Sequence, residues 1–93
     1  MAHKLQSGTT QKIALGAASV ASTAFGKATY AIRVVATGNC HIETGPAPTA
    51  TASSAYIAAN QRGETFAVNP EEKIAVIQDA SATGDLYVTE LTR

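Results

Sequence analysis

The chain has 93 residues, and its seven Lys and Arg balance its seven Asp and Glu to give a formal net charge of zero. Such a chain has no broad positive field to hold a polyphosphate backbone, so we expect no nucleic-acid partner. Its stretches of apolar residues fall short of the roughly 20 needed for a membrane span, and its polar start is unlike a secretory signal. We therefore expect no membrane partner and synthesis in the cytoplasm.

The first eleven residues contain Gly8 among polar neighbours and show neither helical nor strand periodicity. We expect residues 1–11 to form an extended N-terminal arm, and residues 12–93 to form a single domain. Past Lys12, a short apolar run is interrupted by Gly16, and alternation resumes after it. This pattern predicts one bent strand or two short ones.

The strongest strand pattern runs from Thr29 to Ala36. Its even-numbered side chains, from Tyr30 onward, share one apolar face, and Arg33 lies on the other. We expect that second face to be wet; the alternative is that a partner supplying a carboxylate covers it. The run from Cys40 to Thr44 predicts the next strand. Cys40 has no partner for a disulfide in this chain, and we expect it to pack as a small apolar residue.

Residues 45–54 hold two prolines among small and hydroxyl residues, which predicts a loop. Short strands are expected at residues 55–59 and 65–69, the second stopped by Pro70. Two alternating runs then follow, from Lys73 to Asp79 and from Asp85 to Leu91. The five small or polar residues between them predict an antiparallel hairpin.

These elements amount to about eight short strands, so we expect an all-β antiparallel sandwich or jelly-roll-like barrel. A chain of this length has a modest core and exposed sheet edges. We therefore expect copies of the chain to associate with one another.

Two side chains on one strand face, His41 and Glu43, have the spacing by which barrel proteins present metal ligands. A metal site needs three or four ligands, and the other histidine, His3, lies in the expected arm. The adjacent pair Glu71 and Glu72 cannot face a common point as general acid and base. We therefore expect no metal, no cofactor and no catalytic residues.

Four segments carry a resemblance to a known class of protein: QKIALGAASVASTAFG, TYAIRVVATGNCHIETGPAPTA, FAVNPEEKIAVIQD and LYVTEL. With these segments the chain resembles small virion proteins of tailed bacteriophages, of the capsid decoration or cement type. The resemblance implies a homotrimer on the outer surface of the capsid, where subunits of the major capsid protein meet, and a role in stabilising the head. In the arm, Leu5 would be the apolar anchor and Lys4 the charge contact with a partner.

Two other classes stay open. The chain could be a different virion component, such as a head fibre base, a tail protein or a head-completion protein. It could also be a cupin-like β module that binds metal or sugar, for which His41 and Glu43 would need further ligands.

Overall fold

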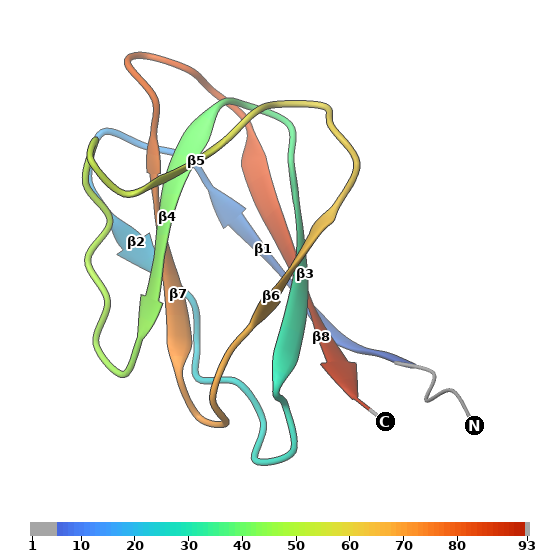
Figure 1. The fold of residues 1–93 in the computed structure, drawn as a ribbon. Helices are drawn as coiled ribbons and strands as arrows, with labels where there is room; N and C mark the ends of the chain where they lie inside the picture. Colours follow the sequence, from blue (N-terminus) through green and yellow to red (C-terminus); the bar gives the residue numbers. More distant parts are fainter. Residues whose placement is uncertain (1–5, 93) are drawn as a thin grey trace.

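The computed structural model describes residues 6–92, which form eight strands in two four-stranded antiparallel sheets packed as a sandwich (Figure 1). This confirms the all-β sandwich expected from the sequence. No helix among these residues is long and apolar enough to cross a membrane. The strands are β1 (Gln6–Ala14), β2 (Val20–Ala21), β3 (Ala31–Ala36), β4 (Cys40–Gly45), β5 (Ala55–Ile57), β6 (Glu64–Ala67), β7 (Lys73–Gln78) and β8 (Asp85–Thr92).

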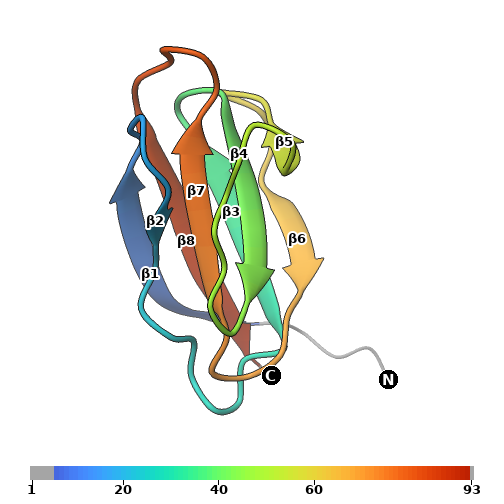
Figure 2. The ribbon, with the colours of Figure 1, turned by 90° about the vertical axis from the view of Figure 1, so that its left-hand side faces the viewer.

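The first sheet has the strand order β1-β8-β3-β6, and the second has the order β2-β7-β4-β5 (Figure 2). Alternation of apolar side chains explains which face of each strand is buried. In β3, Ile32 and Val34 are buried in the core while Arg33 is exposed, as the sequence predicted. Tyr30 differs from expectation, because it lies just before β3 and is 65% exposed.

The predicted hairpin between β7 and β8 is wrong, because these two strands lie in opposite sheets. After β7 the chain makes a turn in which the amide of Ala82 donates to the carbonyl of Asp79. It then crosses to the other sheet. The apolar side chains of the two strands, Val76 and Val88 among them, belong to one buried core. Two strands with alternating apolar and polar residues and a short loop between them are compatible with either a hairpin or this crossing, so the sequence pattern does not distinguish the two.

The start of the domain also differs from expectation, because β1 begins at Gln6 and runs through position 11. It pairs with β8 along its length, and Thr10 and Thr89 hydrogen-bond across the pair at 3.0 Å. A bulge between Ser7 and Thr10 interrupts the alternation, so the part of the strand before Lys12 shows no period in the sequence. Residues 1–5, including Lys4 and Leu5, lie outside the described residues.

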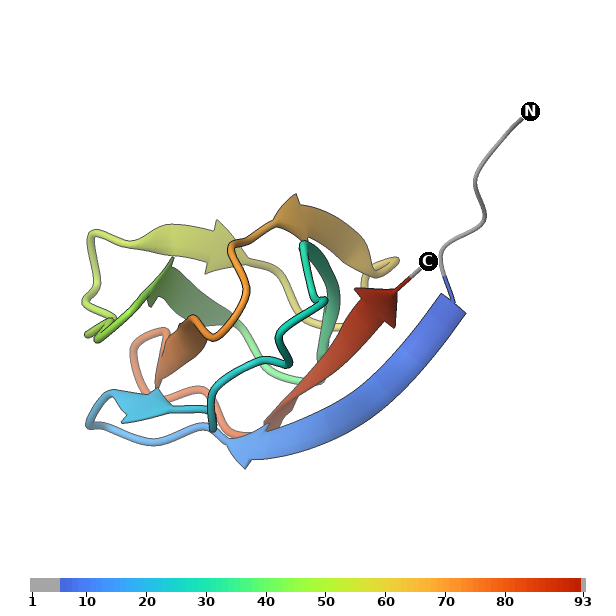
Figure 3. The ribbon, with the colours of Figure 1, turned by 90° about the horizontal axis from the view of Figure 1, so that it is seen from below.

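One end of the sandwich is closed by the loop between β2 and β3. Figure 3 looks at the molecule from this end and shows the loop crossing between the sheets. Phe25 from this loop is buried in the core. The buried carboxylate of Glu90 on β8 holds the loop, accepting hydrogen bonds from the Gly26 amide at 2.9 Å and the Thr29 hydroxyl at 2.5 Å.

Candidate functional site

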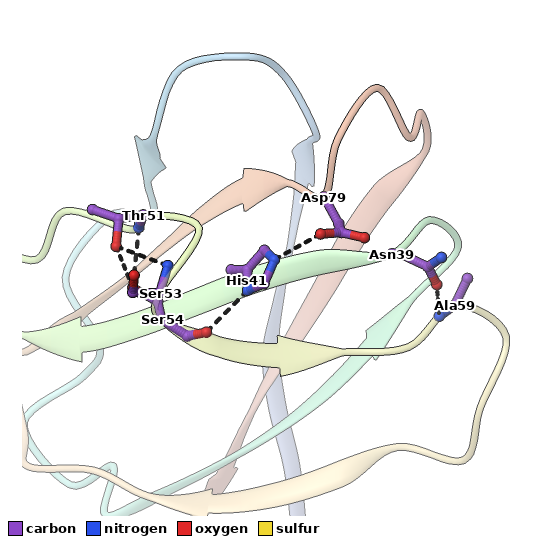
Figure 4. A network of polar contacts seen from close by, with 7 residues as sticks. All are labelled: Asn39, His41, Thr51, Ser53, Ser54, Ala59 and Asp79. Carbon is purple, nitrogen blue, oxygen red and sulfur yellow. Dashed lines mark hydrogen bonds and ion pairs between the residues drawn. The ribbon is translucent and has the colours of Figure 1, made fainter.

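The most developed polar cluster surrounds His41 on the outer face of the second sheet (Figure 4). His41 points away from the core, yet it is only 8% exposed. Its Nδ1 lies 2.9 Å from the carbonyl oxygen of Ser54, and its Nε2 lies 2.9 Å from a carboxylate oxygen of Asp79. The ring also meets Tyr56 edge to face, with 5.4 Å between ring centroids. One imidazole therefore joins β4, the loop before β5 and the loop after β7.

Both neighbours of the His41 ring nitrogens are acceptors, and a neutral imidazole has only one N–H to donate. The arrangement therefore suits the imidazolium, which donates from both nitrogens. Two hydrogen bonds raise the pKa of His41 above 6.5: the bond to the Ser54 carbonyl has the larger effect, and the bond to Asp79 the smaller. Burial of the ring acts in the opposite direction and lowers the pKa.

The loop of residues 46–54 is ordered by a second set of bonds around Ser54. The Ser54 hydroxyl donates to Glu43 at 3.0 Å and accepts from the Thr51 amide at 3.0 Å. Further along, the amide of Ala50 donates to the Ser19 hydroxyl near β2. The loop thus spans from β4 to the β2 edge and runs over the outer face of the second sheet (Figure 2), where Ala75 on β7 is fully buried.

This geometry does not make a catalytic or metal-binding arrangement. The Ser54 hydroxyl bonds to Glu43, and only the backbone carbonyl of Ser54 meets His41, so His41 cannot act as a base toward that hydroxyl. Among residues 6–92 there is no group of three or more His, Cys, Asp or Glu side chains that could hold a metal ion. His41 and Glu43, which the sequence placed on one face, fasten the chain's own loop instead.

Cys40 occupies the core beside this cluster and has no exposed surface. Burial, together with the negative charge of Asp79, raises the pKa of its thiol to about 11. The thiolate is the reactive form of cysteine, so Cys40 is inert in the folded chain. Its packing in the core agrees with the prediction made from the alternation of its strand.

The outer face of the first sheet has a different character, because many of its side chains are exposed. The register places Lys12, Tyr87 and Val35 in one row across β1, β8 and β3. The next row is Thr10, Thr89, Arg33 and Thr65, and a third holds Leu91, Ala31 and Ala67. We call these ten residues the Lys12–Arg33 face.

Two cations dominate the Lys12–Arg33 face. Both Lys12 and Arg33 are exposed, and the three rows contain no carboxylate; Asp85 lies one row beyond them. The guanidinium of Arg33 lies so close to Gly63 that a Cβ there would be 2.5 Å from its Nε. Apolar and hydroxyl side chains fill the space between the cations. The composition of this face, with two cations among apolar and hydroxyl side chains, therefore suits contact with another protein.

The sequence alone does not reveal all the members of the His41 cluster or of the Lys12–Arg33 face. Asp79 is 38 positions from His41, and only the pairing of β4 with β7 brings them together. Lys12 and Arg33 share a face because β8 lies between their strands. The predicted contact residues Lys4 and Leu5 lie outside the described residues.

Comparison of the chain with protein-family models, with characterised proteins and with solved structures gives no match. A function therefore has to be inferred from the residues and their geometry.

Proposed function

We propose that this chain is a structural virion protein that binds the outer surface of a phage capsid at subunit junctions and stabilises the head. The resemblance described above suggests this role, with the major capsid protein as partner, self-association into a homotrimer, and no enzymatic activity. The observation that carries the proposal further is the contrast between the two outer faces of the sandwich.

One outer face is partly covered by the chain itself, whereas the other is not. The loop of residues 46–54 runs over the second sheet, on whose outer face Ala75 is fully buried. The Lys12–Arg33 face has no such cover among the described residues, and it presents two cations among Thr, Ala, Val and Tyr side chains. Protein interfaces combine apolar and aromatic contacts with a polar rim, and opposite charges fix their register. We place the capsid contact on this face.

The small size of the sandwich is compatible with the role. Each contact would be limited by the area of one four-stranded sheet, so a single copy would bind weakly. Several linked copies bind far more tightly, because each contact after the first is made at high effective concentration. Self-association would therefore serve head stabilisation directly.

Co-sedimentation with empty, expanded heads of the same phage, assembled without this chain, tests the proposal. We expect saturable binding at a fixed ratio to the major capsid protein. The double charge reversal Lys12→Glu with Arg33→Glu should abolish it. The matched control, Lys27→Glu with Lys73→Glu, makes the same charge change on the end loop and on the second sheet. Control binding should equal that of the unmodified chain.

Failure of the unmodified chain to bind heads would overturn the proposal and favour a head fibre, tail or head-completion role. Equal loss of binding in both double variants would overturn the assignment of the Lys12–Arg33 face. The metal- or sugar-binding alternative receives no support from the His41 cluster, where both ring nitrogens already have protein partners.

A further inference from the structure

β5 and β6 are the edge strands of their sheets and lie on the same side of the sandwich (Figure 2). A groove lies between the residues of these two edges. Its volume is about 180 Å3. This is below the roughly 300 Å3 at which pockets for small-molecule ligands begin. The groove has room for one or two side chains. It is lined by Ile42, Glu43, Thr44, Ala55, Phe66 and Ala67.

The groove lies beside a part of β4 that has a paired strand on one side only. β7 pairs with β4 through to Gly45, whereas β5 pairs with β4 only from Cys40 to Ile42. Along Glu43–Gly45, the described strands therefore leave one edge of β4 open, where a longer β5 would lie. On the other wall, β6 is the last strand of its sheet. Open edges of this kind accept an added strand through backbone hydrogen bonds.

We propose that the segment around Lys4 and Leu5 of a second copy of this chain occupies the groove as an added strand. Successive side chains of a strand point to opposite faces. With Leu5 inward it would meet Ile42 and Phe66, and Lys4 would then point outward, on the side of Glu43. The segment thus places an apolar residue, Leu5, next to Ile42 of β4 and a cationic residue, Lys4, next to Glu43 of β4.

The chain cannot place Leu5 in its own groove. Leu5 is bonded to Gln6, so their Cα atoms are about 3.8 Å apart. Gln6 begins β1, at the opposite edge of the first sheet from β6. Ser7 and Ala67 share a row across the sheet, separated by three strand spacings, or about 14 Å. The occupant of each groove therefore comes from another copy, which links copies edge to edge.

Sedimentation velocity of the full chain at several concentrations tests the proposal. We expect the unmodified chain to associate, and Leu5→Glu and Ala67→Lys each to raise the dissociation constant about tenfold or more, because a buried Leu contact is lost or blocked. Ala24→Lys adds the same charge at an exposed loop position and should associate like the unmodified chain. Far-UV circular dichroism and the thermal midpoint establish that each variant is folded.

A cross-linking experiment reports the contact directly. Mixing a Leu5→Cys variant with an Ala67→Cys variant under mild oxidation should give a disulfide between the two copies, whereas Leu5→Cys with Ala24→Cys should not. Cys40 is buried and does not compete. A monomeric unmodified chain, unchanged association of Leu5→Glu, or equal cross-linking to positions 67 and 24 would overturn the proposal. These measurements use the free protein, so their failure is distinguishable from failure to bind heads.

Discussion

His41 should make the protein less stable as the pH rises. Its imidazolium donates to the Ser54 carbonyl and to Asp79, and these bonds raise its pKa above 6.5. In the unfolded chain the pKa of histidine returns to its ordinary value. A raised folded pKa stabilises the fold fully below the unfolded pKa, and this contribution is lost as the pH rises through the folded pKa. The free energy of unfolding should therefore fall as the pH rises beyond about 6.5.

The magnitude follows from the two bonds of His41. Hydrogen bonds from a charged donor contribute about 1.5–3 kcal/mol when they are shielded from water. The Ser54 bond is of this kind, but the Asp79 side chain is 40% exposed, so screening reduces its bond to about 1 kcal/mol or less. His41→Gln keeps a neutral donor that can serve one acceptor. We expect this substitution to lower the free energy of unfolding by about 2 kcal/mol below neutral pH.

Urea unfolding followed by far-UV circular dichroism, at about pH 6 and about pH 9, measures both effects. The unmodified chain should be less stable at the higher pH, and His41→Gln should remove most of that difference. An NMR titration of the His41 ring, assigned with His3→Asn, gives its pKa. A His41 pKa at or below 6.5, or the same pH dependence in both proteins, would refute this reasoning.

Three further predictions concern the fold. Gly38→Ala should destabilise the chain by several kcal/mol in thermal unfolding, because the added Cβ would overlap the Thr83 carbonyl oxygen. Gly16→Ala is the control and should change stability little, because the space around Gly16 is open. Equal effects of the two substitutions would contradict this reasoning. Glu90→Ala should cost about 2 kcal/mol in urea unfolding, since it leaves the buried Thr29 hydroxyl and the Gly26 amide without their acceptor; a loss below about 1 kcal/mol would count against these bonds. Cys40 should react with a thiol reagent only as fast as the chain unfolds, and rapid reaction of the native protein would contradict its burial.

The sequence was sufficient to predict strands but not their partners. Alternation identified the buried face of β3, because a side chain facing the core is apolar whichever strand lies beside it. It could not distinguish a hairpin from a crossing between sheets, since both place Val76 and Val88 in the same core. The first half of β1 escaped detection because its polar residues and its bulge obscure the period, although the strand pairs with β8 on both sides of the bulge.

For a similar reason, the sequence predicted only part of the His41 cluster. The spacing of His41 and Glu43 placed both on one face, and that placement does not depend on the rest of the fold. The third member, Asp79, comes from the end of another strand, and Ser54 contributes a backbone carbonyl that no side-chain pattern reveals. Without these partners, the pair resembled an incomplete ligand set rather than a fastening for residues 46–54.

The most direct test of the proposed function is electron cryomicroscopy of expanded heads carrying the bound chain. We predict density for the sandwich outside the shell at junctions between capsid subunits, with Lys12 and Arg33 turned toward the shell and the loop of residues 46–54 turned away. Density with the 46–54 loop against the shell would contradict the assignment of the face. Heads without any density for the chain would contradict the proposed function itself.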